Sequence, residues 1–490
     1  MSWTNTSTTH VLDPFSAVLL VSCYELGHQS FAIASACAQL RSVGLDVIVA
    51  DASIEPPSDE VLARVRLVAI SVPMHTALRL GVAIARRVRV VNPTAHVCFF
   101  GLYASLNSAY LLAGIIDSVI AGEFEPALVE LALRLAWPKS SAERGIAVPS
   151  PPNLRRVKFL QPRREDLPAL NHYARLLGPT QGEKRLVGYV EASRGCLHKC
   201  LHCPITPVYG GRFFVVPRDV VLSDARQQIE AGAQHITFGD PDFLNGPGHS
   251  MAIVTALHKE HPTITFDITV KVEHIIEHKG KFSELARLGC IFVVSAVESL
   301  SNRVLAELEK GHERADIVEA IEITRHAGIA LRPSLLAFTP WTTLCDYIEL
   351  CEFIFDQDLV DHVDPIQLAI RLLLPPGSAL LAGNRPRPWL GSLAPADFGY
   401  TWVHPDPRMD ALHAEVSRIV GRGTQCNDDA FDTLRRIRVA SYAAGGLPLP
   451  AEPLVRTRRF VPKLSEAWFC CAEPNATQLG QVTACKSKAG

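Results

Sequence analysis

Three cysteines within eight residues are the side chains of this sequence best suited to chemistry. Cys196, Cys200 and Cys203 follow a CxxxCxxC spacing, so one loop can bring three thiolates to a single metal cluster. Soft thiolates suit iron–sulfur clusters. Three protein ligands leave one iron of a [4Fe-4S] cluster open, as a chemically active centre requires. A zinc knuckle is the alternative, because His198 and His202 could supply a fourth ligand.

The elements around this loop alternate between strand-like and helical patterns. Six βα units in about 200 residues predict a partial (β/α)₆ barrel, with the cysteine loop directly after its first strand. Ligands of such barrels lie at the carboxyl ends of the strands, which is where the loop falls. The six predicted strands are Leu186–Glu191, His235–Phe238, Thr265–Val270, Ile291–Ser295, Ala330–Ser334 and Pro365–Ile370.

A second, earlier alternation predicts another α/β unit. Short β-branched runs separated by amphipathic stretches indicate an open, doubly wound, Rossmann-like sheet. Its five predicted strands are Ala17–Cys23, Asp46–Ala50, Leu67–Val72, His96–Phe100 and Ser118–Ala121. The predicted organisation is a Rossmann-like domain at 1–135, a surface linker at 136–186, the barrel at 187–385, and a mainly helical extension with a cysteine tail at 386–490.

The cysteine loop and several later motifs resemble the radical SAM superfamily, whose open iron binds the amino and carboxylate groups of S-adenosylmethionine (SAM). Gly239-Asp240-Pro241-Asp242 falls where that family has its segment for the SAM amino group, and Glu298-Ser299 matches a further strand motif. The resemblance implies that Gly239, Asp240, Asp242 and Glu298 bind SAM and that His202 lies near the adenine. Asp240 and Asp242 could instead cap a helix, and Glu298 could be a buried salt-bridge partner.

The first domain resembles the cobalamin-binding domain that precedes many radical SAM barrels. Gly122-Glu123-Phe124-Glu125 matches its GExE segment. The cobalamin histidine motif DxHxxG is absent from the corresponding loop, and Met74 and Tyr103 could block the cleft. A structural or substrate-docking role is therefore preferred, with cobalamin binding as the alternative.

The end of the chain carries a second cysteine group, Cys470 and Cys471 followed by Cys485. The segment resembles the CCAEP tails of some radical SAM proteins. It could form another metal site, a redox thiol pair, or a three-sulfur seat for trivalent arsenic, with Cys485 or Cys426 as the third donor. The last interpretation gains from a resemblance to radical SAM enzymes of arsinothricin biosynthesis. It makes Cys470 and Cys471 catalytic in transferring the 3-amino-3-carboxypropyl group of SAM to arsenite.

Two rival functions remain from the sequence, a cobalamin-dependent radical methyltransferase and a non-catalytic thiol protein that binds metals or metalloids. A net charge of −2 over 490 residues excludes a strongly basic nucleic-acid surface. The sequence lacks an apolar run of membrane-spanning length and a signal peptide, so we expect a cytoplasmic protein that does not bind membranes. The expected partners are a small-molecule substrate, such as arsenite, and a reducing electron donor such as flavodoxin or ferredoxin. Cys23, Cys37, Cys98, Cys290, Cys345 and Cys351 are expected in the core.

Overall fold

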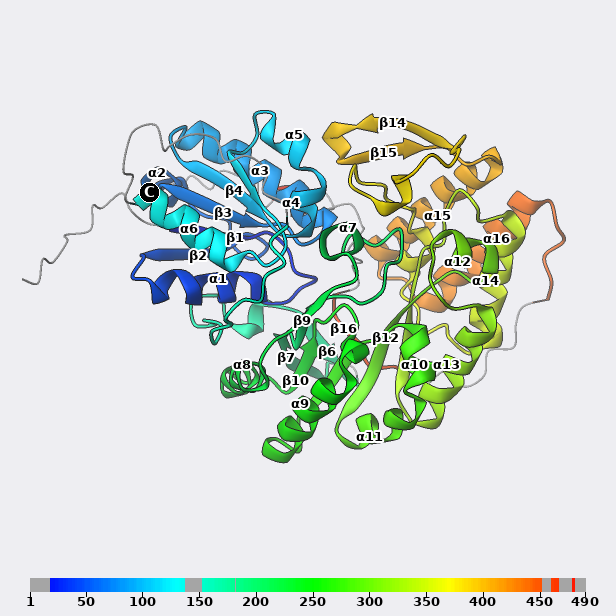
Figure 1. Cartoon of the computed structure of the whole chain (residues 1–490). Coiled ribbons are helices and arrows are strands. Elements are labelled where there is room, and N and C mark those ends of the chain that lie inside the picture. The colour runs from blue at the N-terminus through cyan, green and yellow to red at the C-terminus, as the bar shows by residue number, and fades with distance from the viewer. Residues whose placement is uncertain (1–17, 137–151, 181, 452–459, 467–477, 481–490) are drawn as a thin grey trace, which may run out of the picture.

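The computed structural model describes residues 18–136, 152–180, 182–451, 460–466 and 478–480. Within these ranges the chain forms two main sheets, one above the other in Figure 1, with helices on their faces. Cys470, Cys471 and Cys485 lie outside the described residues. None of the described helices is both long and apolar enough to span a bilayer.

The first sheet is parallel, with strand order β2-β1-β3-β4-β5. This is the doubly wound arrangement predicted, and the predicted strands are confirmed to within one residue at each described end. Its strands are β1 (Val18–Ser22), β2 (Val47–Asp51), β3 (Leu67–Ser71), β4 (His96–Phe100) and β5 (Ser118–Ile120). Its helices are α1 (Phe31–Ser42), α2 (Asp59–Arg64), α3 (His75–Val91), α4 (Leu102–Leu106), α5 (Ser108–Leu112) and α6 (Glu125–Ala136).

The second sheet has the order β13-β12-β11-β10-β7-β6-β16, in which the five strands from β13 to β7 are parallel. These strands curl into the predicted partial barrel, shown in green in Figure 1. They are β7 (Lys184–Val190), β10 (His235–Phe238), β11 (Thr265–Thr269), β12 (Cys290–Glu298) and β13 (Ala330–Leu335). The helices that cover them are α8 (Arg218–Glu230), α9 (Pro247–Glu260), α10 (Val272–Glu277), α11 (Phe282–Arg287), α12 (Asn302–Glu307), α13 (Arg314–His326) and α14 (Leu344–Asp356).

The predicted sixth strand at Pro365–Ile370 is wrong. Residues Pro365–Ala369 form a 3₁₀ helix, η5, and only an isolated bridge joins Phe338 to Arg371. Pro365 at the start has no N–H group for a ladder. The side chain of Gln367 takes over the pairing instead, since its Oε1 accepts a 2.9 Å hydrogen bond from Leu335 N at the edge of β13.

The predicted surface linker at 136–186 is also wrong for its described part. Arg164 is 6% exposed, and Phe159, Leu167 and Leu170 are buried as well. Arg164 donates bidentate hydrogen bonds to Asp224 of α8 at 2.9 and 2.7 Å. This segment also supplies β6 (Arg175–Leu177), so it is an integral part of the barrel wall.

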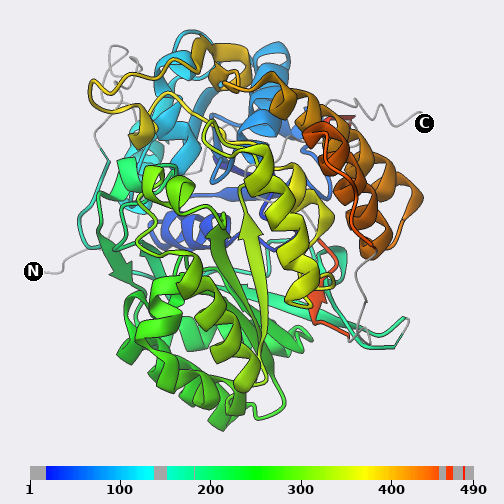
Figure 2. The same cartoon turned by 90° about the vertical axis from the view of Figure 1, so that its right-hand side faces the viewer.

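The C-terminal helices α15 (Pro407–Cys426) and α16 (Ala430–Gly445) lie against the barrel beside α14, as Figure 2 shows from the side. Their apolar faces share the barrel core. Before them, β14 (Leu390–Ala394) and β15 (Gly399–Trp402) form a hairpin. After them, β16 (Lys463–Leu464) pairs antiparallel with β6. Of the six single cysteines expected in the core, Cys345 is exposed, because it lies in the first turn of α14, and the other five are buried.

Candidate functional site

The three-cysteine loop lies at the carboxyl end of the barrel. It begins after the short strand β8 (Ser193–Gly195) and ends before α7 (Thr206–Tyr209). Cys200 is buried, and Cys196 and Cys203 are partly exposed. Burial, together with the nearby Cys200 and Cys196, raises the pKa of Cys203 to about 12. The three thiols are thus close enough to interact, and their softness, number and partial access fit a cluster with one open iron.

Gly239 and Asp240 support this loop from the end of β10. The carboxylate of Asp240 accepts hydrogen bonds from Ala192 N at 2.9 Å and from Ser193 Oγ at 2.5 Å. A Cβ on Gly239 would lie 1.9 Å from Tyr189 Oη, so only glycine fits there. The described contacts of Asp240 therefore hold the start of the cysteine loop, and it does not cap a helix.

Asp242 has two roles because its two oxygens face different partners. Oδ1 accepts from Leu244 N at 3.0 Å and caps the 3₁₀ helix η3 (Phe243–Asn245), as the helix-cap alternative predicted. Oδ2 lies 2.7 Å from His274 Nδ1 and 3.4 Å from His198 Nε2. Burial acts to raise the pKa of Asp242, but the two imidazoles outweigh it and the pKa is lowered. His274 was not among the predicted site residues.

Glu298 forms a buried ion pair beside the cysteine loop. It ends β12 with a φ of 64°, a left-handed conformation that is rare for glutamate and recurs at functional sites. Its Oε1 lies 3.4 Å from Lys310 Nζ and 3.3 Å from His202 Nε2. Burial opposes ionisation, yet Lys310 and His202 lower the pKa of Glu298 to about 2. The salt-bridge interpretation thus fits, and the structure brings Glu298 and His202 together.

Arg194 of β8 links the two α/β units next to the cysteine loop, and no sequence motif indicated this contact. Its guanidinium donates to Glu125 at 2.7 and 3.0 Å and to Glu123 at 3.3 Å. It also lies 5.0–5.2 Å from the ring centroids of Phe31, Phe124 and Phe159. Both glutamates of the GExE segment therefore contact the residue two positions before Cys196.

The loops after β3 and β4 are closed at the end of the first sheet. Met74 is 8% exposed and Tyr103 is 2% exposed. Gly101 has a φ of 109°, and a Cβ there would lie 3.0 Å from the carbonyl oxygen of Val72. This glycine brings the loops after β3 and β4 together and closes this part of the strand ends.

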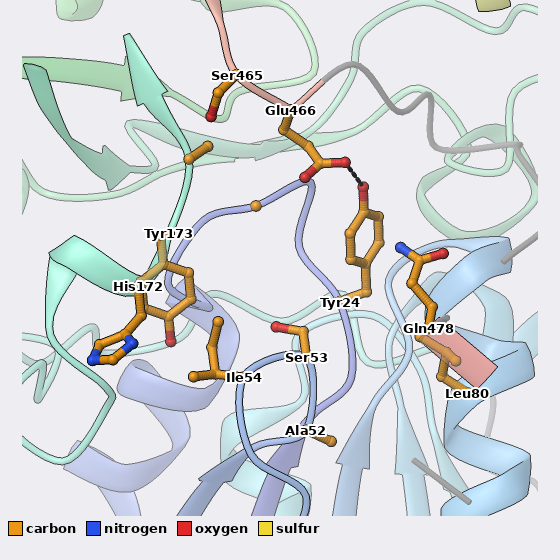
Figure 3. Close-up of a pocket in the computed structure, with 12 residues that line it drawn as sticks. Tyr24, Ala52, Ser53, Ile54, Leu80, His172, Tyr173, Ser465, Glu466 and Gln478 are labelled. Atoms are coloured by element: carbon orange, nitrogen blue, oxygen red, sulfur yellow. Dashed lines mark hydrogen bonds between the residues drawn. The ribbon is translucent and has the colours of Figure 1, made fainter. Parts of the chain in front are cut away.

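A cavity of about 280 Å³ lies at the ends of β1 and β2. Figure 3 shows Tyr24, Tyr173 and Ser53 around it, with Glu466 accepting a hydrogen bond from Tyr24 Oη at 2.8 Å. Gln478 also lines it. Glu466 and Gln478 are the described residues on either side of 467–477, the range that contains Cys470 and Cys471. Cys426, the alternative donor, is exposed at the end of α15.

The fold and the site together describe a Rossmann-like sheet joined to a partial barrel that bears a three-cysteine loop. Residues 190–354 match the radical SAM superfamily. Residues 190–354 are therefore similar to a radical SAM domain, and this stretch contains the cysteine loop and the parallel strands β10 to β13 of the barrel.

Three relatives illustrate the similarity. The chain is 24% identical over 216 residues to a methylthiotransferase-named protein of Methanocaldococcus jannaschii, covering 40% of this chain and 46% of that one. It is 25% identical over 152 residues to the hopanoid C-3 methylase of Methylococcus capsulatus, covering 31% and 29%. It is 29% identical over 167 residues to a tRNA-2-methylthio-N(6)-dimethylallyladenosine synthase of Chlorobium luteolum, covering 32% and 36%. The matched stretch thus spans less than half the length of each relative.

Two solved structures share the fold. The cobalamin-dependent SAM radical enzyme OxsB, in its apo form, superposes with a TM-score of 0.65 at 14% identity, covering 88% of this chain and 72% of that one. The radical SAM methyltransferase TsrM of Kitasatospora setae, with cobalamin and a [4Fe-4S] cluster, gives a TM-score of 0.56 at 17% identity, covering 78% and 81%. Both neighbours confirm the architecture of two α/β units.

Proposed function

We propose that this protein reductively cleaves SAM with a [4Fe-4S] cluster held by Cys196, Cys200 and Cys203. The observation that carries the proposal is the position of three interacting thiols on one loop at the carboxyl end of a partial barrel. The cluster, when bound, supplies one electron to the sulfonium of SAM through its open iron. The open position follows from the three-thiolate ligand set.

The surrounding residues would bind and orient SAM. His202 and Glu298 lie together beside the loop and are proposed to contact the nucleoside part. Lys310 keeps Glu298 ionised, so that carboxylate can accept hydrogen bonds at any physiological pH. Gly239, Asp240 and Asp242 are proposed to form the wall next to the amino acid part of SAM. Asp240 does so by fixing the loop, as its two bonds to Ala192 and Ser193 are already made.

The finer proposal is transfer of the 3-amino-3-carboxypropyl group to trivalent arsenic bound by Cys470, Cys471 and Cys485. One electron breaks the bond from sulfur to the aminocarboxypropyl carbon and leaves 5′-methylthioadenosine. A second electron from the same donor completes the carbon–arsenic bond, and one thiolate leaves arsenic. The proposal is supported by the resemblance of the tail and by the preference of pyramidal As(III) for three sulfurs. The three cysteines themselves lie outside the described residues.

A cobalamin-dependent methyltransferase is the second candidate, and it is favoured by the fold shared with OxsB and TsrM. The closed loops at Met74, Gly101 and Tyr103 argue against it. A non-catalytic thiol protein is the third candidate, and it would bind arsenite without consuming SAM.

The nucleoside released from SAM separates these candidates, because each breaks a different bond at sulfur. We expect anaerobically reconstituted, reduced protein to form 5′-methylthioadenosine in an arsenite-dependent reaction. Changing Cys196, Cys200 and Cys203 together to Ala should remove four irons per chain and all product. S-adenosylhomocysteine together with 5′-deoxyadenosine, and a requirement for cobalamin, would favour the methyltransferase. Undiminished iron in the triple variant would overturn the cluster assignment.

A further inference from the structure

Three potential metal ligands converge at the barrel mouth outside the cysteine set. His198 lies in the cysteine loop, Asp242 follows β10, and His274 lies in α10 after β11. One ligand atom of each lies within 4.8 Å of the other two. Asp242 is 1% exposed and His274 is 8% exposed. The group therefore combines three successive strand ends in a site almost closed to bulk solvent.

The three atoms lack the hydrogen bonds that such burial normally requires. His198 Nε2, Asp242 Oδ2 and His274 Nδ1 are all buried and have no hydrogen-bond partner among the described residues. Leaving a buried polar atom without a hydrogen bond is energetically unfavourable. His274 Nδ1 nevertheless lies 2.7 Å from Asp242 Oδ2 without the geometry of a hydrogen bond. A cation bound by both atoms would satisfy the two groups.

We propose that His198, Asp242 and His274 bind one divalent transition-metal ion of the Zn²⁺, Fe²⁺ or Co²⁺ type. Two imidazoles and one carboxylate form a nitrogen–oxygen ligand set that suits these ions. Bonds of about 2.0–2.2 Å place tetrahedral ligands roughly 3.4 Å apart, and His198 Nε2 and Asp242 Oδ2 are separated by 3.4 Å. Three protein ligands leave a position open for a carboxylate or another oxyanion oxygen.

Residues behind the ligands suit this role. His198 Nδ1 lies 3.4 Å from Glu273 Oε2 and 3.1 Å from Lys271 Nζ. Metal binding at Nε2 requires Nδ1 to carry the proton and to donate it to Glu273, and Lys271 then pairs with Glu273 alone. A Cβ on Gly311 would lie 2.7 Å from Glu273 Oε1, so the glycine leaves room for this carboxylate.

The ion also changes the role of Asp242. Its Oδ1 already caps η3, and its Oδ2 would hold the metal, so both oxygens are occupied. The direct contact with SAM that the sequence predicts for Asp242 is then replaced by a contact with the ion. His198 lies between Cys196 and Cys200, so the ion would fix the cysteine loop to β10 and α10.

The test uses a full-length chain in which Cys196, Cys200, Cys203, Cys470, Cys471 and Cys485 are all Ser, so that neither cluster nor tail thiols take up metal. Titration with Co²⁺ should saturate at one ion per chain, with visible ligand-field bands and no thiolate charge-transfer band. In this background His274→Ala should weaken Co²⁺ binding at least tenfold, and Glu273→Gln should weaken it about 10- to 100-fold. His326→Ala, on an exposed surface, is the matched control and should bind as the parent does.

Absence of stoichiometric Co²⁺ binding, or equal binding by His274→Ala, would overturn the site. If Asp242 instead holds the ammonium group of SAM, Co²⁺ will not bind, and Asp242→Asn will weaken SAM binding to the cluster-loaded protein. Should the six-serine chain not fold by circular dichroism, metal content beyond four irons is compared between the reconstituted wild-type chain and His274→Ala. Because the first assay needs neither cluster nor SAM, its outcome is independent of the proposed transfer reaction.

Discussion

The two parallel sheets of this chain end in different ways. At the first sheet, the loops after β3 and β4 are filled by the chain itself, with Met74 and Tyr103 buried and Gly101 against Val72. At the second sheet, the corresponding ends carry three thiols, a buried ion pair at Glu298, and polar atoms without partners around Asp242. Both sheets have the topology that places ligands at carboxyl strand ends.

This difference shows that topology alone does not make a binding site. The loops after β3 and β4 fill the space at their strand ends, but the first sheet keeps a cavity at the ends of β1 and β2, and the buried Ser22 Oγ at the end of β1 has no hydrogen-bond partner among the described residues. At the second sheet the unsatisfied groups lie beside the three thiols, where they are ready to bind a ligand. The first sheet also supports the second, through Arg194 and the two glutamates that hold it. Three variants of the full-length chain test this difference.

The largest effect is expected from Arg194→Ala, which removes a buried link between the two α/β units. The change leaves Glu123 and Glu125 buried without their cation, and breaking a buried pair in this way costs about 3–5 kcal/mol. Urea unfolding of the variant should show a loss of this size. Arg226→Ala removes a half-exposed pair with Glu260 and should cost less than about 1 kcal/mol. Equal stability of both variants would contradict the supporting role.

A pH-dependent effect is expected from Glu25→Gln in the loop after β1. Burial and the neighbouring Glu191 raise the pKa of Glu25 to about 8, while an unfolded glutamate titrates near 4.3. Between these values the folded chain binds more protons than the unfolded chain. The stability of the wild type should therefore fall by up to about 1.4 kcal/mol for each pH unit, and level off above pH 8.

Glu25→Gln lacks this titration, so it should become more stable than the wild type as the pH rises from 4.5 to 8. Thermal unfolding at a series of pH values measures the difference. Glu130→Gln, on an exposed position of α6, should keep the wild-type profile. A stability difference between Glu25→Gln and the wild type that does not change with pH would show that Glu25 is solvated and ionised throughout this range.

The smallest effect tests whether the first sheet is closed. Gly101→Ala and Gly44→Ala both place alanine at a positive φ, 109° and 81°. Only Gly101 has backbone atoms near the added methyl, since the space around Gly44 is open. Gly101→Ala should exceed Gly44→Ala in lost stability by about 1–3 kcal/mol, the usual cost of overpacking. Equal losses of stability would indicate that the loops after β3 and β4 separate easily, and would favour ligand binding between them.

The sequence predicted the fold well wherever a local pattern determines the structure. Short β-branched runs between amphipathic stretches located the strands of both sheets, and the cysteine spacing located the loop. The false strand at Pro365–Ile370 had a visible warning, because proline is rare inside a paired strand. The segment at 136–186 was predicted as a surface linker because its charged residues suggested exposure to solvent. In the structure, Arg164 of this segment is buried against Asp224.

The rest depends on contacts between distant residues, which no local pattern encodes. Arg194 meets Glu125 across 69 positions, and β16 pairs with β6 almost 300 positions earlier. His274 approaches Asp242 only because β10 and β11 are neighbours in the sheet. In the sequence it is one of 18 histidines and follows no recognised motif. The unsatisfied atoms of its neighbours Asp242 and His198 could be recognised only from the structure, which shows their burial and their missing hydrogen bonds.

The arginine that joins the sheets limits how this chain can be recombined. A barrel expressed alone would expose the guanidinium of Arg194 without its two glutamates, and a first sheet expressed alone would expose Glu123, Glu125 and the rings of Phe31 and Phe124 that now lie against this guanidinium. Exchange of either half between relatives should therefore succeed only when Arg194, Glu123 and Glu125 travel together. The two halves therefore have to be exchanged together, although each resembles an independent module.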